Sequence, residues 1–182
     1  MTYKEILAFH GHECPGIAIG YRMTKAALAE LKALRSEDEE LVAIVENDAC
    51  GVDALQCLTG CTFGKGNLVF RDYGKNVYTL YSRTSKAGVR VSFDTKRIAL
   101  GLREKRDDFT QWILSAPLEE MLTTERVFIE EPEHAKMHKS VVCAFCGEGV
   151  MESRLRQCHG KPACIPCYLE HQKSEQTMQA TE

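Results

Sequence analysis

Two pairs of closely spaced cysteines near the C-terminal end constrain this chain more than any other feature of its sequence. The pairs are separated by seventeen residues and consist of Cys143, Cys146, Cys164 and Cys167. Each CxxC turn lets two sulfur atoms converge, and four thiolates at about 2.3 Å satisfy the tetrahedral preference of Zn²⁺. We therefore predict that residues 143–167 form a small module around one structural zinc ion, which supplies most of its stability.

The segment between the pairs leaves the ligand set open at one place. Cys158 and His159 lie there, and either side chain could replace Cys164 in the zinc shell. A closed shell of four thiolates has no position for water or substrate, so such a zinc ion would hold the shape of the module or bind a partner. Three basic residues of the segment could offset the charge of the site or contact a partner: Arg154, Arg156 and Lys161.

The chain contains nine cysteines and carries a formal net charge of −3. No stretch approaches the roughly 20 apolar residues of a membrane-spanning helix, and residues 1–12 lack the features of a signal peptide. We therefore expect a cytoplasmic protein. In that reducing compartment, nine cysteines are expected to serve metal binding or redox chemistry and not disulfides. The charge gives no broad attraction to nucleic acids or membranes, so we expect neither as a partner.

The length and the apolar pattern indicate an α+β fold with an antiparallel sheet packed against helices, followed by a small Cys₄ zinc ribbon. At 182 residues the chain is long for one domain and short for two, since domains most often contain about 100–150 residues. Pro132 marks the expected boundary. The predicted parts are a core domain over 1–131, a linker over 132–139, a zinc-ribbon domain over 140–173 and a flexible tail over 174–182.

Local signals within the core domain predict its elements. Thr2 is a suitable cap for a first helix, and a third helix would end at Gly60. The helices are expected over 3–9, 16–34, 49–58 and 103–115. The run over 41–46 has the composition of a buried strand. An antiparallel meander is predicted from three runs that lie between turn residues: 68–73, 76–83 and 88–93. A last strand or extended segment is expected over 125–131.

A short string near the N-terminus gathers three side chains that bind metals. In an extended segment His10, His12 and Cys14 would point to the same side, because side-chain direction repeats every second residue. Cys14 also lies just before the helix expected near Gly16, where the positive end of the helix dipole favours a thiolate. The string suits a metal ligand or a reactive nucleophile, although turn histidines and a small buried cysteine would look the same.

A second group, about forty residues later, supplies further thiols. On a helix, Cys50, Asp53 and Cys57 share one face, and Cys61 follows just past the helix end. Core packing is the alternative explanation, because free cysteine is among the most buried residue types. We expect the two groups to meet in a Cys/His cleft, which requires the N-terminal string to lie against the cysteine-bearing helix.

Two other patterns have simpler explanations. The string that starts at Gly60 is close to a phosphate-binding loop, but only three residues separate Gly60 from Gly64, and Gly66 replaces the Ser or Thr that binds Mg²⁺. His134 and His138 have the spacing of helical metal ligands, yet their polar surroundings favour exposed linker residues. We assign no ligand to either pattern.

The strings FHGHECPG and CGVDALQCLTGCTFGKGN, with the later GKPACIPCY, closely resemble the FmdE-like family, which is named after a subunit of formylmethanofuran dehydrogenase. The resemblance extends over nearly the whole chain. It implies an α+β core, a zinc ribbon and an intertwined dimer. The last string alone also resembles the zinc finger of the DksA/TraR type.

The resemblance further implies a set of conserved positions in the core, which fall on His10, His12, Cys14, Cys50, Asp53, Gln56, Cys61 and Thr62, with Cys57 as a neighbour. Five of the residues in the core are candidate ligands of a second metal ion: His10, His12, Cys14, Cys50 and Cys61. The candidate catalytic residues are Cys14, Cys50 and Asp53, and Gln56 and Thr62 would orient the ligands. Mixed nitrogen and sulfur ligation suits zinc, iron, nickel or copper.

Two functional hypotheses follow. The family takes its name from the molybdenum or tungsten enzyme that reduces CO₂ to formylmethanofuran, but this sequence has no ferredoxin-type cysteine run. The resemblance therefore implies a metal-binding accessory or redox subunit, with other oxidoreductase subunits as partners. The alternative is a dimeric regulatory or scaffolding protein whose zinc ribbon binds a macromolecule.

Overall fold

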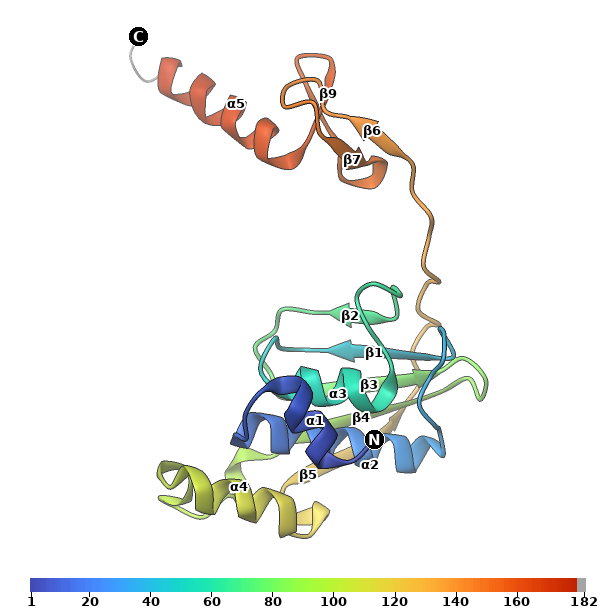
Figure 1. The fold of residues 1–182 in the computed structure, drawn as a ribbon, viewed down its shortest axis with the longest axis vertical. Helices are drawn as coiled ribbons and strands as arrows, with labels where there is room; N and C mark the ends of the chain where they lie inside the picture. Colours follow the sequence, from blue (N-terminus) through green and yellow to red (C-terminus); the bar gives the residue numbers. More distant parts are fainter. Residues whose placement is uncertain (180–182) are drawn as a thin grey trace. The chain divides into compact units, whose positions relative to one another are not determined.

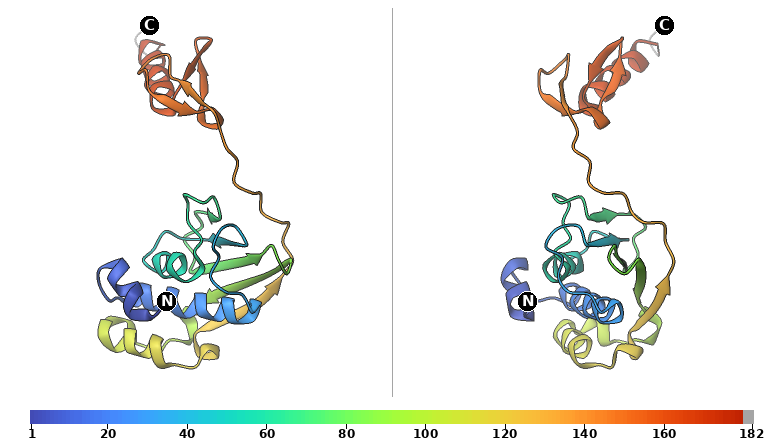
Figure 2. Two further views of the ribbon diagram at one scale, coloured as in Figure 1. Left: turned by 45° about the vertical axis from the view of Figure 1, so that its right-hand side comes forward. Right: turned by 90° about the vertical axis from the view of Figure 1, so that its right-hand side faces the viewer.

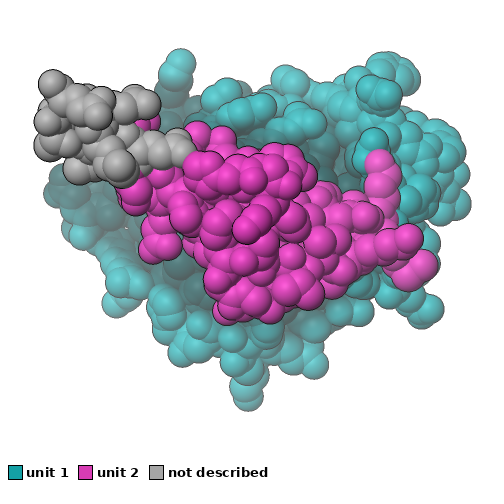
Figure 3. Space-filling model, turned by 90° about the horizontal axis from the view of Figure 1, so that it is seen from above, with its two compact units in different colours: residues 1–135 teal, residues 136–182 magenta. Residues whose placement is uncertain are grey.

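The chain folds as two compact units, Met1–Ala135 and Lys136–Glu182, which are coloured separately in Figure 3 and are called unit 1 and unit 2 below. The computed structural model describes residues 1–179. The predicted flexible tail begins within the last helix, and its final three residues lie outside the described ones. Among the described helices, none has the length and apolar character needed to cross a membrane.

Unit 1 is built on a five-stranded sheet with the order β2-β1-β3-β4-β5 (Figure 1). Its strands are β1 (Leu41–Val45), β2 (Leu68–Phe70), β3 (Val77–Ser82), β4 (Ala87–Phe93) and β5 (Leu122–Val127). Neighbouring strands are antiparallel except β1 and β2, which run parallel. The predicted α+β class is confirmed.

The predicted antiparallel meander over 68–93 is wrong at its first strand. β2 pairs with β1 and not with β3, so β1 lies between them. β1 is buried along its whole length and suits a central position, whereas Phe70 in β2 is 38% exposed and suits an edge. A helix lies between β1 and β2 in the chain, and a parallel pair requires such a crossover.

The helices of unit 1 follow local signals. They are α1 (Tyr3–His10), α2 (Pro15–Leu31), α3 (Gly51–Thr59) and α4 (Arg106–Ser115). Thr2 caps α1 in a capping box with Glu5, and Gly60 ends α3 in the left-handed conformation, both at predicted places. α2 ends earlier than predicted, because Lys32 takes a left-handed conformation with φ of 51°. The helix expected over 103–115 starts later, after a 3₁₀ turn.

The helices cover one face of the sheet, and the segment after β5 crosses the other (Figure 2). Apolar side chains of the helices pack with strand residues that point toward them: Leu41, Ala43, Val45, Leu80, Val89 and Val91. On the opposite face, Tyr81 Oη donates to Glu131 Oε2 at 3.4 Å. Residues 129–133 line a hollow there with Ile44 and Thr79. Residues 129–133, called the exit segment below, therefore shield the second face of the sheet.

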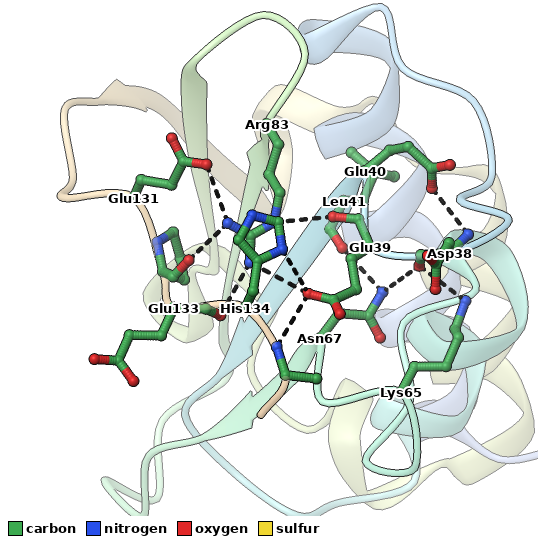
Figure 4. A network of polar contacts seen from close by, with 12 residues as sticks. Asp38, Glu39, Glu40, Leu41, Lys65, Asn67, Arg83, Glu131, Glu133 and His134 are labelled. Carbon is green, nitrogen blue, oxygen red and sulfur yellow. Dashed lines mark hydrogen bonds and ion pairs between the residues drawn. The ribbon is translucent and has the colours of Figure 1, made fainter. Parts of the chain in front are cut away.

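Arg83 fastens this exit segment to the sheet (Figure 4). Its guanidinium donates to three backbone carbonyl oxygens at 2.7 to 3.0 Å: those of Glu39, Pro132 and Glu133. It also donates to Glu131 Oε1 at 3.1 Å, and Lys86 and Arg83 together lower the pKa of that carboxyl group. His134 is exposed, as predicted, and its Nδ1 lies 3.0 Å from Glu39 Oε2. The segment is thus held through its backbone.

Two glycines let α2 and α3 approach closely. A Cβ atom on Gly20 would lie 2.2 Å from the carbonyl oxygen of Gly51 and 2.4 Å from its Cα. No side chain fits at this distance, which is why glycine is required where two backbones meet. Because Gly51 is the first residue of α3, the contact holds the N-terminus of α3 against the first turns of α2.

Unit 2 consists of two short hairpins followed by a helix. β6 (Ser140–Val142) pairs with β7 (Gly149–Met151), β8 (Arg156–Cys158) pairs with β9 (Lys161–Ala163), and α5 spans Ile165–Gln179. Among the described residues of this unit, the buried ones are Cys143, Cys158, Ala163 and Cys164. Such a core is too small to hold a fold by apolar burial alone, so the unit needs another source of stability.

Gly20→Ala tests the contact between α2 and α3. In a helix interior this change normally stabilises by about 0.5–1 kcal/mol. Here the added methyl group would meet the Gly51 backbone, and we expect the free energy of unfolding to fall by about 1–3 kcal/mol in chemical denaturation. Lys25→Ala, an exposed change in the same helix, is the control and should stay within about 0.5 kcal/mol of wild type. A Gly20→Ala protein as stable as wild type would contradict the contact.

Candidate functional site

Cys14 is positioned by the start of α2. It is the N-cap residue of this helix, with Pro15 at the first helical position, and its sulfur accepts a hydrogen bond from the Ile17 N–H at 3.5 Å. Cys14 is 5% exposed. The positive end of the helix dipole faces the sulfur, as the sequence predicts.

His10 reaches the same sulfur from the end of α1. Gly11 ends α1 with φ of 93° and turns the chain, and His10 Nε2 lies 3.9 Å from Cys14 Sγ. On the other side of the ring, Nδ1 lies 2.7 Å from Asp53 Oδ2. An ionised carboxylate only accepts hydrogen bonds, so Nδ1 donates to Asp53 and Nε2 is the ring nitrogen that faces the sulfur.

Cys50 completes a group of three donors. It directly precedes α3, and its sulfur, the Cys14 sulfur and a ring nitrogen of His10 all lie within 4.8 Å of one another. In a tetrahedral zinc site, a nitrogen and a sulfur ligand are about 3.6 Å apart. The separation of 3.9 Å between His10 Nε2 and Cys14 Sγ is close to that value. These three residues, called the core donor group below, could therefore hold a metal ion.

The electrostatic surroundings of Cys50 oppose a free thiolate. Burial, and after it the neighbouring Cys14 sulfur, raise the pKa of Cys50, and Asp53 adds to the shift. Several anions in so small a space would repel one another. A bound cation would reverse this balance, because a thiol that coordinates a metal ion loses its proton.

A cavity of about 370 Å³ opens beside the core donor group and is lined in part by His10, Cys50, Asp53 and Gln56. Small-molecule sites occupy about 300–1,000 Å³, so this volume suits a small ligand. A larger hollow of about 440 Å³ lies near the end of α2, but its described lining residues include neither cysteine nor histidine. The smaller cavity is therefore the better candidate site.

Several residues of this cavity escape prediction from the sequence. Asn47 follows β1, Phe70 ends β2, and Phe63 lies in the loop after α3; all three line the cavity. Ligands of β-α-β units bind at the carboxyl ends of the parallel strands, so the pairing of β1 with β2 would have pointed to them. Tyr78 is also missed: its buried hydroxyl group lies beside Gly51, and burial, with Asp53 and Cys50 nearby, raises its pKa.

The structure does not place Cys61 with the other candidate ligands. Cys61 is fully buried beyond the C-terminal end of α3, where its thiol donates to a backbone carbonyl oxygen of β1 at 3.5 Å. Thr62 belongs to the same loop, and its N–H donates to Asn67 Oδ1 at 2.9 Å. Cys57 is buried in an apolar cluster. Cys50 and Cys61 lie at opposite ends of one helix, so both cannot belong to one metal shell.

His12 and Gln56 lie nearer to the core donor group. The predicted extended segment is wrong, because His10 belongs to α1 and Gly11 turns the chain. His12 is exposed, and its ring centroid lies 4.5 Å from that of His10. Gln56 Nε2 donates to Asp53 Oδ1 at 3.5 Å. Gln56 therefore helps to hold the carboxylate that orients His10.

The four cysteines of the C-terminal pairs meet in unit 2. Their sulfur atoms all lie within 4.8 Å of one another, and those of Cys146 and Cys164 are 3.9 Å apart. In a tetrahedral zinc site, thiolate sulfur atoms are about 3.8 Å apart. This four-cysteine group could therefore hold a metal ion. Cys158, the alternative ligand left open by the sequence, lies in a different group of the described residues.

Backbone N–H groups surround the sulfur of Cys143. The Cys164 N–H donates to it at 3.3 Å. Donation by the N–H of Cys146, and then by those of Cys164 and Phe145, lowers the pKa of the Cys143 thiol to about 6. A thiol that ionises this readily is prepared to bind a cation.

Comparison with known proteins identifies the family to which unit 1 is similar. The model of a family described as "FmdE, Molybdenum formylmethanofuran dehydrogenase operon" matches residues 9–135. The chain belongs to the FmdE family. The match includes the whole core donor group and ends where unit 1 ends, at Ala135. The DksA/TraR-like resemblance of the C-terminal segment stays a prediction.

Relatives of this FmdE-family protein carry two different descriptions. A protein of Archaeoglobus fulgidus described as "Probable S-adenosyl-L-methionine-binding protein" is 32% identical over 187 residues. The alignment covers 87% of this chain and 50% of the relative, so the chain spans about half the length of that protein. A solved structure from Syntrophus aciditrophicus is described as a "tungsten formylmethanofuran dehydrogenase subunit e (fmde)-like protein". It is 29% identical, with a TM-score of 0.69 and 92% of both chains covered.

Cys143→Ser tests whether a metal ion holds unit 2 together. The buried core of this unit is mostly cysteine, so loss of one ligand should release the metal ion and unfold unit 2 while unit 1 stays folded. In limited proteolysis we expect cleavage within 136–179 to become about tenfold faster, with unchanged resistance of residues 1–135. Ser153→Ala, an exposed change in unit 2, is the control. Equal cleavage of the two variants would mean that no metal ion bound through Cys143 holds unit 2 together.

Proposed function

We propose that this FmdE-family protein is a metal-binding accessory or redox subunit that resembles the FmdE component of molybdenum or tungsten formylmethanofuran dehydrogenase. In unit 1, the core donor group binds a metal ion next to the cavity. In unit 2, the four-cysteine group binds one structural zinc ion. The observation that carries the proposal is the contact of 2.7 Å between His10 Nδ1 and Asp53 Oδ2, which directs Nε2 toward two sulfur atoms.

Asp53 has the position of an outer carboxylate in a metal site. Histidines that bind metals usually donate their other ring N–H to a carboxylate or a carbonyl group, which fixes the tautomer and the orientation of the ring. Here the Asp53 carboxylate is itself held by Gln56, and the side chain of His10 is only 9% exposed. The ring is therefore oriented before any ion binds.

The cavity gives the core site an open coordination position. Three protein ligands leave room for water, a substrate or a further ligand, whereas a shell of four thiolates leaves none. His10 and Cys50 line the cavity, so the open position would face space that a small molecule can enter. The metal ion of unit 1 would therefore take part in chemistry, whereas the zinc ion of unit 2 would hold the shape of that unit. Zinc, iron, nickel and copper all suit the mixed ligands of the core site.

A metal-free thiol site is less consistent with the geometry. In that case Cys14 would be the nucleophile, with His10 as its base and Asp53 orienting the ring. However, Cys14 is buried and is not among the described residues that line the cavity. A substrate in the cavity would meet Cys50 first.

We further propose a cytoplasmic homodimer that associates with other oxidoreductase subunits, without a membrane or a nucleic acid as partner. The formal net charge of −3 argues against binding to polyanions. Exposed aromatic side chains beside the edge strand β2, Phe63 and Phe70, give a second protein chain an apolar surface to cover. The resemblance to dimeric family members supports a second copy of this chain as that partner.

The alternative function is a dimeric regulatory or scaffolding protein whose zinc ribbon binds a macromolecular partner. One observation favours it: three basic residues around the β8–β9 hairpin are exposed, namely Arg154, Arg156 and Lys161. In this alternative, unit 1 supplies dimerisation and binds no metal ion. The metal content of unit 1 therefore separates the two functions.

Metal counting on the full-length protein tests the core site. Cys50→Ala removes one of three donors, so mass-based analysis should show a loss of about one metal ion per chain relative to wild type, with the zinc of unit 2 retained. Cys57→Ala is the matched control, because Cys57 is a cysteine of the same helix that lies outside the core donor group, and it should keep the full count. If Cys50→Ala keeps every metal ion of wild type, the alternative function stands.

Asp53→Asn tests the outer carboxylate. The change keeps the size of the side chain but weakens its hold on His10, so the affinity of the core site for Zn²⁺ should fall about 10–100-fold in competition with a chromophoric chelator. Asp48→Asn is the control, since it removes a charge from the same cavity wall while the contact between His10 and Asp53 stays in place. Equal losses in both variants would mean that only the net charge of the cavity matters.

A further inference from the structure

A second group of metal-binding side chains lies in unit 2, apart from the four-cysteine group. Cys158, His159 and His171 each offer one donor atom, and these three atoms lie within 4.8 Å of one another. Cys158 is 6% exposed, so its thiol is buried in the unit. The sequence leaves Cys158 and His159 open as substitutes for Cys164, but the structure gives them a group of their own.

The β8–β9 turn presents His159 in an uncommon conformation. Cys158 pairs with Lys161, which leaves His159 and Gly160 as a two-residue turn with φ of 49° and 72°. A type I′ turn needs positive φ at both central residues, and asparagine is preferred at the first. Histidine tolerates this conformation, and here it places an imidazole at the tip of the hairpin.

Helix α5 brings His171 to the same place. His171 follows Cys167 by four residues, so it lies one helical turn beyond the four-cysteine group. The ring of Phe145, from the turn of the first cysteine pair, has its centroid 4.5 Å from that of His171. The ring of His159 approaches His171 edge-on at 5.7 Å. The elements that build the first metal group thus also locate the second.

We propose that Cys158, His159 and His171 form a second metal site in unit 2, which takes a transition-metal ion of borderline softness such as Zn²⁺. Two imidazoles and one thiolate suit zinc, nickel and copper. The thiol is buried and His159 is exposed, so the ion has a protein side and a solvent side. Three ligands leave a fourth position for water or for a side chain of a partner, which makes this ion more exchangeable than one inside four thiolates.

The alternative explanation for these three residues is packing without a metal ion. A buried cysteine and two contacting histidine rings could stabilise the small unit without a metal ion. His159→Asn separates the explanations, because asparagine is the residue that a type I′ turn prefers at this position. If His159 has only a structural role, the hairpin keeps its stability and the metal content does not change. If His159 is a ligand, the hairpin remains and a metal ion is lost.

The test uses the full-length chain with Cys14→Ala and Cys50→Ala, so that the core donor group cannot contribute. Titration with Co²⁺, followed by visible absorption and metal counting, should show about two ions per chain in this parent protein. His159→Asn in the parent should lose about one ion and keep the absorption of Co²⁺ bound by four thiolates, which also reports that unit 2 is folded. His171→Gln should give the same result.

His138→Ala is the matched control, since His138 is another exposed histidine of unit 2, 3.9 Å from Glu152 Oε1, and this variant should keep both ions. A parent protein that binds a single Co²⁺ ion would overturn the proposal, as would a His159→Asn protein that binds as many ions as the parent. Neither result bears on the core site, because the parent lacks both of its thiols.

Discussion

The close contact between Gly20 of α2 and Gly51 of α3 determines where the core donor group can form. Because the two backbones touch there, the N-termini of both helices are held near each other, and the residues that precede them, Cys14 and Cys50, become neighbours. A small apolar cluster around Ile6 then holds α1 against the same helices, which brings His10 to the two sulfur atoms. The site is therefore a product of helix packing.

Charge separates the two kinds of metal group. An imidazole and two thiolates neutralise a divalent cation, so the core donor group can be largely enclosed without an isolated buried charge. Four thiolates around the same ion leave a net negative charge, and unit 2 is correspondingly the more open structure, with a buried core of only a few residues. Backbone N–H donors around Cys143 act in the same direction as a cation, because they stabilise the thiolate.

Short-range rules are sufficient for the helix ends and for the four-cysteine group. Thr2 and Gly60 act on their own helices, and each CxxC turn brings two sulfur atoms together locally, so a single long-range contact completes the group. The strand order cannot be predicted in this way. It depends on the complete burial of β1 and on the crossover through α3, which join segments that are distant in the sequence.

The sequence predicts some residues of the core site, but the structure brings them together in a different way from the one predicted. His10 and Cys14 meet because Gly11 turns the chain at the end of a helix, where the sequence predicts an extended segment. The family resemblance groups Cys61 with Cys50, but α3 lies between them, and its rise of 1.5 Å per residue separates its two end residues by about 12 Å. Asn47 and Phe70 are missed because their relevance follows from the parallel pairing of β1 with β2.

The anchoring of His10 by Asp53 also bears on which ions the core site can select. A ring fastened through Nδ1 cannot swing outward to lengthen its bond to an ion, and the two sulfur atoms are attached to helix ends that are packed backbone to backbone. The folded chain thus keeps His10 Nε2 and Cys14 Sγ 3.9 Å apart, close to the separation that a tetrahedral zinc ion would require. Calcium and similar hard cations need six or more oxygen atoms at about 2.3–2.6 Å, and one imidazole nitrogen with two sulfur atoms does not supply them, so the choice of donors disfavours these ions as soon as the chain folds.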